Sequence, residues 1–251
     1  NTYVQSWNFE FDYHDSPIKN HDVTIGAGTR LYRSQVKDPS GQLRMFPVNE
    51  NTTNYNFFIQ DKITLQPNRW TLTLGSKFEE HDYSGFDYQP SARLAYTPNR
   101  KNTLWLAASR AVRTPNRYEP NSNLFFGAVV GNHDVDSETV KTYEAGYRVL
   151  ATEKLSFDFT LFYNDYSDLT TTKVTTGDNL IVNDASADSY GFEVSSNYLA
   201  TNDWQLKLSY SYFDIDTDQE KDNISYFATD NVTAHHQASV YSFYKISKEL
   251  Q

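Results

Sequence analysis

The sequence contains no cysteine, which excludes a disulfide framework and a thiolate metal site. It also lacks any run approaching the roughly 20 apolar residues of a membrane-spanning helix. Basic residues are scarce, since 22 Lys and Arg stand against 32 Asp and Glu for a formal charge of −10, and no basic cluster is present. Phosphate contacts need clustered Lys and Arg, so the charge argues against a nucleic-acid partner.

Apolar residues are also few, at 38% of the 251 residues, and the mean hydropathy is −0.68. Aromatic residues are nevertheless abundant, with 4 Trp, 19 Tyr and 16 Phe. A disordered chain would lack these aromatics, and an ordinary soluble core would draw more on Leu, Ile and Val. The mixture indicates a protein whose apolar residues form a thin surface and whose loops are polar.

Apolar and polar residues alternate with period two along most of the chain, most clearly in LSFDFTLFYNDYSDL, residues 155–169. Its odd-numbered positions from Leu155 to Tyr163 are apolar, and its even-numbered positions from Ser156 to Asn164 are polar except Phe162. Successive strand residues point to opposite faces, so the pattern predicts a two-faced strand. Comparable stretches predict about eleven strands of about 10 to 13 residues, against a usual length of about 5 to 6.

The connections between these strands alternate in length. DSPIKNH, QPNR, PNRKN, ATEK and TND are short, whereas 34–52, 112–137, 167–187 and 214–232 are long and 80–87 is intermediate. Outer-membrane barrels have tight turns at one end, long loops at the other and strands that are apolar outside and polar inside. A soluble β-sandwich has no reason to gather its long loops at one end. We therefore predict an all-β protein, an antiparallel transmembrane β-barrel whose apolar faces contact outer-membrane lipid.

Several segments, in their order and spacing, carry a family resemblance. They are QDKITL (60–65), LTLGSKFEEHDYSGFDYQPSARLAYTP (72–98), SRAVRTPNRYEP (109–120), YEAGYR (143–148), LFYNDYSDL (161–169) and YGFEVSSNY (190–198). Together they resemble the barrel of TonB-dependent outer-membrane receptors, from about residue 54 to the end. The resemblance implies a receptor in the outer membrane of a Gram-negative bacterium that binds a scarce nutrient, by default a ferric siderophore. It implies import with energy from TonB, no enzymatic activity and no cofactor.

Barrels of that family have 22 strands, a plug domain and a short TonB-binding segment ahead of the barrel, and an aromatic residue in the last strand. About half of the strands are predicted here, and the chain stops at KISKELQ. We therefore expect residues 1–251 to form a partial receptor barrel domain, without the plug domain and the last strands. Two alternatives stay open, a passive porin-type barrel and a soluble β-rich carbohydrate-binding domain.

Candidate ligand-binding residues lie where a strand rises into a long loop. The resemblance places Arg110 and Arg113 on the inner wall, where they would pair with acidic plug residues or bind an anionic ferric complex; otherwise they are solvated arginines at the base of a loop. The loop over 112–137 contains the apolar patch LFFGAVV. Aromatic residues with a few polar anchors are typical of ligand sites, so Tyr118, Phe125 and Phe126 are candidate contacts, unless the patch packs on neighbouring loops.

Asp214, Asp216 and Asp218 are spaced like the start of a calcium loop. That motif then requires Gly and Glu where this chain has Gln219 and Ser225. A solvated acidic loop is therefore favoured over a divalent-cation site. His235 and His236 are adjacent and would point to opposite faces of a strand, so no histidine metal site is expected.

Overall fold

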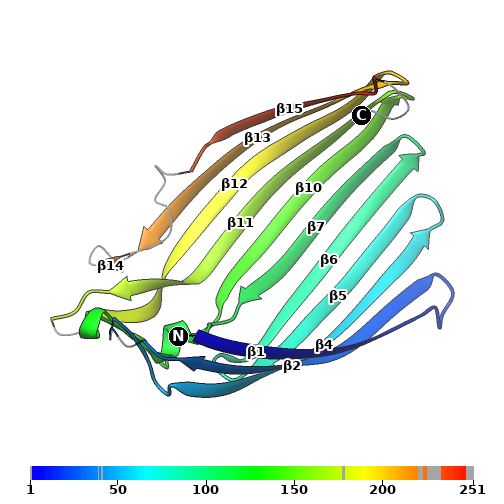
Figure 1. Ribbon diagram of the computed structural model, residues 1–251. Coiled ribbons are helices and arrows are strands. Elements are labelled where there is room, and N and C mark those ends of the chain that lie inside the picture. Colours follow the sequence, from blue (N-terminus) through cyan, green and yellow to red (C-terminus); the bar gives the residue numbers. More distant parts are fainter. Residues whose placement is uncertain are drawn as a thin grey trace.

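The computed structural model describes residues 2–38, 40, 42–176, 179–219, 223–224 and 233–246. These residues form one 15-stranded sheet that is curved and open (Figure 1). Every strand pair is antiparallel except β9 with β12. Within the described residues, no helix is long and apolar enough to span a membrane.

Eleven long strands follow one another across the sheet in chain order, which confirms the predicted number. They are β1 (Thr2–Asp15), β2 (His21–Val36), β4 (Asn49–Gln66), β5 (Trp70–His81), β6 (Gly85–Asn99), β7 (Asn102–Arg113), β10 (Glu138–Thr152), β11 (Leu155–Lys173), β12 (Asn179–Thr201), β13 (Trp204–Gln219) and β15 (His236–Tyr244). Short turns join them at one end of the sheet. The long connections, between β2 and β4, β7 and β10, and β13 and β15, lie at the other end, which we call the long-loop end; residues 82–84 alone join β5 to β6 there, so the predicted connection over 80–87 is a short turn.

The short elements lie in the long connections. They are β3 (Leu43–Met45), α1 (Tyr118–Asn121), β8 (Ser122–Leu124), η1 (Phe125–Gly127), β9 (Val129–Val130) and β14 (Asn223–Ile224).

The two faces of the sheet differ as the alternation predicts. Leu161 is 61% exposed, and its direct cross-strand partners are Ala145 and Phe192. We call this apolar side the outer face. The next residue, Thr160, lies on the inner face opposite Gly146 and Glu193. An exposed apolar face of this extent is expected where a sheet contacts lipid.

A row of tyrosines marks the outer face toward the long-loop end. Tyr143, Tyr163 and Tyr190 lie directly opposite one another on β10, β11 and β12. The Tyr190 hydroxyl donates a hydrogen bond to Asp214 at 2.9 Å. An amphipathic ring with its polar end hydrogen-bonded is suited to the boundary between hydrocarbon and water.

The strands are longer than the sequence pattern predicts. β11 continues to Lys173 and β12 begins at Asn179, so most of the predicted 167–187 loop is strand. The prediction was wrong because apolar residues do not alternate here: Leu180, Ile181 and Val182 are consecutive and the rest of the segment is mostly polar, so the period-two signal is lost. Cross-strand pairing still continues, for example between Thr171 and Val182.

Phe162, the apolar exception on the polar face of β11, lies over a glycine of the next strand. A Cβ on Gly191 would stand 2.7 Å from Cζ of the Phe162 ring and 2.1 Å from the backbone oxygen of Tyr212. Phe162 also stacks on Phe213 with ring centroids 6.2 Å apart. A large ring can therefore lie flat on the inner face because its cross-strand neighbour has no side chain.

The hydrophobic core lies in the long loops rather than beneath the sheet. We call residues 42–48 and 114–137 the cap. In the cap β3 pairs with β8 and β8 with β9, while β9 pairs with β12. Leu124, Val129, Val135 and Ile181 form one buried cluster against which Leu43 packs. The two cap segments and the start of β12 are thus joined by backbone hydrogen bonds and by a shared core.

Candidate functional site

A cavity of about 860 Å³ lies between the cap and the inner faces of β1, β2, β4 and β5. We call it the cap cavity. Its wall mixes cationic, acidic, aromatic and amide side chains, among them Arg30, Glu79, Tyr32, Tyr118 and Asn56. Such a mixture of aromatic surface and a few polar anchors is typical of a small-molecule site.

Arg113, the last residue of β7, anchors the cap to the sheet. Its Nη2 lies 2.6 Å from Oε1 of Glu119 and 2.6 Å from Oε1 of Glu138, and its Nε donates to Oε2 of Glu138 at 2.7 Å. Both carboxylates are about nine-tenths buried, so each needs the cation to offset its desolvation. The acidic partners of Arg113 therefore come from this chain.

Arg110 lies on the outer face, which corrects its expected place on the inner wall. It is directly opposite Lys141, and its guanidinium lies 4.6 Å from the centroid of the Tyr88 ring. It also donates a hydrogen bond to Oγ1 of Thr139 at 3.1 Å. The reason is parity, since residues three apart on a strand point to opposite faces, so Arg110 and Arg113 do not share a wall.

A second arginine, Arg117, ties the cap to the sheet from the other side. Its Nε lies 2.7 Å from Oε2 of Glu50, and its Nη1 donates to Oγ of Ser34 at 2.7 Å. Glu50 also accepts hydrogen bonds from the Tyr83 hydroxyl at 2.8 Å and from the Asn121 amide at 3.0 Å. Burial, together with the hydrogen bond to Glu50, raises the pKa of Tyr83 above its ordinary value.

The three aromatic candidates do not lie together. Tyr118 lines the cap cavity, whereas Phe125 is 61% exposed and has a backbone φ of +48° in η1. The Phe125 backbone N–H donates to the carbonyl oxygen of Gln42 at 2.7 Å. The side chain of Phe126 lies outside the described part of the chain. Ligand contact by Phe125 and Phe126 stays a prediction.

Asp214, Asp216 and Asp218 are on strand β13 rather than in a loop, and they share one face. Asp214 accepts the hydrogen bond from Tyr190, while Asp216 lies opposite Asp188. Ser225, the last position of the compared motif, is outside the described residues. Across the residues that the structure does describe, no three His, Cys, Asp or Glu side chains gather closely enough to hold a metal ion.

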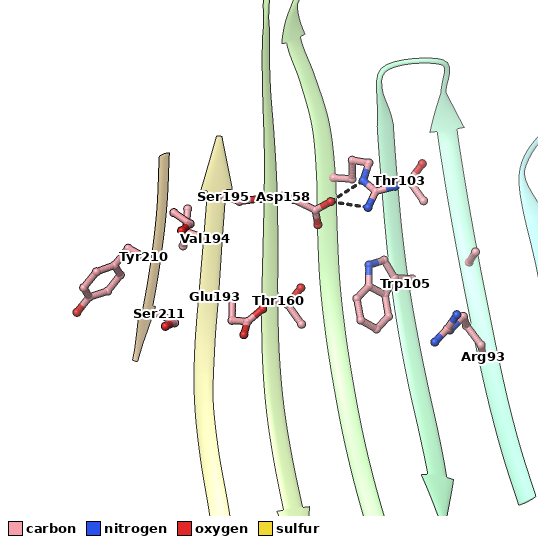
Figure 2. A pocket seen from close by; sticks show the side chains of 13 residues that line it. Arg93, Thr103, Trp105, Asp158, Thr160, Glu193, Val194, Ser195, Tyr210 and Ser211 are labelled. Carbon is pink, nitrogen blue, oxygen red and sulfur yellow. Dashed lines mark hydrogen bonds and ion pairs between the residues drawn. The ribbon is translucent and has the colours of Figure 1, made fainter. Parts of the chain in front are cut away.

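A second pocket, the wall pocket, occupies about 640 Å³ on the inner face of β6 to β13. Figure 2 shows Trp105 lying across the sheet beside Arg93. The Arg148 Nε donates to Oδ2 of Asp158 at 2.6 Å, and the Arg93 guanidinium lies 5.7 Å from the Trp105 ring centroid. The inner wall is therefore lined by charged and aromatic side chains.

Comparison with known proteins identifies this arrangement. A sequence profile of the family described as TonB dependent receptor-like, beta-barrel matches residues 1–247. The chain belongs to this family.

Two curated relatives of this receptor-family chain come from Pseudomonas aeruginosa. The ferric enterobactin receptor is 27% identical over 173 residues, which cover 58% of this chain and 23% of that protein. The ferric enterobactin receptor PirA is 27% identical over 124 residues, which cover 43% of this chain and 16% of that protein. The chain thus spans less than a quarter of the length of either relative.

Solved structures share the fold of the receptor-family barrel. The siderophore receptor PirA from Acinetobacter baumannii superimposes with a TM-score of 0.76 at 17% identity, covering 98% of this chain and 41% of that one. A variant of the ferric enterobactin receptor from P. aeruginosa gives a TM-score of 0.71 at 18% identity, covering 84% and 36% of the two chains.

On the inner wall of this TonB-dependent receptor barrel, Gly146 is expected to tolerate no larger side chain. A Cβ on Gly146 would stand 2.2 Å from Cε2 of Trp105, so Gly146→Ala is expected to push the indole off the wall and to destabilise the barrel by about 1–3 kcal/mol. Urea unfolding followed by tryptophan fluorescence measures the loss. In a Trp105→Ala background the same change is expected to be neutral or stabilising, and equal losses in both backgrounds would contradict the explanation.

The sequence prediction missed the acidic partners of the cap, namely Glu50, Glu119 and Glu138. The signal available in this receptor-family sequence was the stretch RTPNRYEPN, which holds two arginines, two asparagines and a glutamate within nine residues. Such density of hydrogen-bonding groups indicates a folded loop, but it does not name the partners.

Proposed function

We propose that the chain forms part of the wall and of the extracellular loops of an outer-membrane receptor that binds a ferric siderophore and imports it with energy from TonB. The observation that carries the proposal is the cap cavity, which is set at the long-loop end of a sheet with an apolar outer face and a polar inner face. In this proposal the long-loop end faces the outside of a Gram-negative cell. The remaining strands of a 22-stranded barrel, the plug domain and the TonB-binding segment belong to the rest of the receptor.

The wall of the cap cavity carries three cationic side chains, Arg30, Lys77 and Arg117, and three acidic ones, Glu10, Asp12 and Glu79. Lys77 is paired with Glu79, so the support for an anionic ligand comes from Arg30. Arg30 donates to Oδ1 of Asn8 at 3.3 Å, and it forms no ion pair with any residue that the structure describes. Tyr32 and Tyr118 offer ring surface from the sheet and from the cap, respectively. We assign Arg30, Tyr32 and Tyr118 to ligand contact, and we assign Arg113 to holding the cap in place.

A passive porin-type barrel is less well supported, because the interlocked cap would obstruct free diffusion. A soluble carbohydrate-binding domain is also less well supported, because an exposed apolar face such as that around Leu161 would have no second sheet to pack against.

Uptake of radioactive ferric enterobactin by cells that produce the full-length receptor tests the proposal. Uptake is expected to require the receptor gene and TonB, and Arg30→Gln is expected to lower the affinity by about tenfold, the effect of losing one hydrogen bond to a charged group. Uptake that persists without TonB would favour the porin. Absence of receptor-dependent uptake would overturn ferric enterobactin as the substrate.

A further inference from the structure

Glu50 is a point at which the start of β4, the short turn 82–84 and the cap segment 114–137 meet. It stands near the start of β4, and its carboxylate accepts hydrogen bonds from Tyr83, in the β5–β6 connection, and from Asn121, in the cap segment 114–137. The ion pair with Arg117 is its third contact. The carboxylate is 16% exposed, so two hydrogen-bond donors and the neighbouring guanidinium replace most of its water.

Arg117 contacts Glu50 and also lines the cap cavity. Its guanidinium bonds to Ser34 on β2 and to the carbonyl oxygen of Pro47 in the other cap segment. A single side chain therefore holds both cap segments to the sheet and is within reach of a ligand.

We propose that the Glu50–Arg117 pair is a latch: it holds the two cap segments as one unit, and an anionic ligand in the cavity releases it by taking Arg117 from Glu50. The planar guanidinium can form paired hydrogen bonds with an oxyanion as well as with a carboxylate. Glu50 would keep its hydrogen bonds from Tyr83 and Asn121 after the exchange, so it would not be left buried without donors. The ligand part of the proposal rests on the proposed function.

Because β3 and β8 pair with each other, loss of the Arg117 contacts is expected to affect both cap segments at once. Release of Arg117 breaks the contacts to Ser34 and Pro47 together, while the β3–β8 ribbon and its core stay intact. Residues 42–48 and 114–124 are therefore expected to move together rather than as two independent loops.

Hydrogen–deuterium exchange of the full-length receptor without ligand tests the latch. Glu50→Gln keeps the shape of the side chain and removes its charge, so amides of 43–48 and 119–124 are expected to exchange about tenfold faster or more, in parallel. Glu153→Gln, in an exposed turn at the opposite end of the sheet, serves as the matched control and is expected to change neither segment. Acceleration of one segment alone, or of neither, would overturn the latch.

Tyr83→Phe provides a milder variant in case Glu50→Gln does not fold. It removes one donor to Glu50 and leaves the ion pair, so both segments are expected to exchange only a few-fold faster, again in parallel. A change confined to the β5–β6 turn would count against a shared carboxylate.

The affinity for ferric enterobactin tests whether the ligand takes Arg117 from Glu50, because two substitutions are expected to change this affinity in opposite directions. Glu50→Gln frees Arg117 and is expected to tighten binding, whereas Arg117→Gln is expected to weaken it, each by about tenfold. If the ion pair had only a structural role, both Glu50→Gln and Arg117→Gln would weaken binding. That result would overturn the proposed exchange of partners. Absence of binding in the wild type would instead count against the proposed function, and the ligand-free exchange rates would still decide the latch.

Discussion

Replacing Arg113 with leucine is expected to lower the free energy of opening of the cap by about 3 kcal/mol, because two buried carboxylates lose their cation. Glu119 and Glu138 keep backbone donors, Asn116 N–H at 2.7 Å and Thr170 N–H at 2.9 Å. Because of those contacts and the 43% exposure of the Arg113 side chain, the expected loss of free energy is at the lower end of the range for breaking a buried ion pair. The measurement is hydrogen exchange of amides in 116–131 in the full-length receptor, with the barrel strands as internal reference.

Arg110→Leu is the matched control for Arg113→Leu. It removes the same group three residues away, where the partners are the Tyr88 ring and uncharged oxygens, so the expected loss is about 1 kcal/mol or less. The triple variant Arg113→Leu, Glu119→Gln, Glu138→Gln is expected to regain much of the loss, since no buried charge is left unpaired. Equal losses for Arg113→Leu and Arg110→Leu would contradict the anchoring role of Arg113.

The second large effect concerns the outer face. Leu161→Arg is expected to destabilise the receptor in a lipid bilayer by about 2–3 kcal/mol, because a guanidinium on the lipid face of a barrel strand must leave water or distort the bilayer. Leu161 is 61% exposed and shares its face with Phe159 and Tyr163. Urea unfolding of the full-length receptor in liposomes gives the free energy directly.

The neighbouring Thr160→Arg is the control for the lipid-facing change. Thr160 lies on the inner face opposite Glu193, where an added cation meets water and a carboxylate, so a loss under about 1 kcal/mol is expected. Similar small losses for both variants would mean that the apolar face does not contact lipid. That result would return the soluble alternative to consideration.

The long strands were predictable because period two is a local property of the sequence. β11 could be read from residues 155–164 alone, since lipid on one side and water on the other impose a different residue type at every step. Its continuation to Lys173 was not predictable from that signal, because both sides of the strand are polar beyond the apolar band.

The cap depends on contacts that are distant in the sequence. Glu50 and Asn121 are 71 residues apart, and no local pattern in ENTTNY marks the glutamate as the acceptor for two other loops. The misplaced Arg110 is a different kind of error, since the spacing of three residues from Arg113 already assigned the two arginines to opposite faces of β7.

The pairing of β3 with β8 and of β9 with β12 has a consequence for exchanging loops between receptors. A single loop moved into another barrel would bring half of a ribbon, leaving unpaired backbone groups and a fragment of a hydrophobic core at the surface. A chimera with altered ligand choice therefore has to transplant 37–48, 114–137 and the start of β12 as one set. Selection acting on one of these loops is constrained in the same way by the other two.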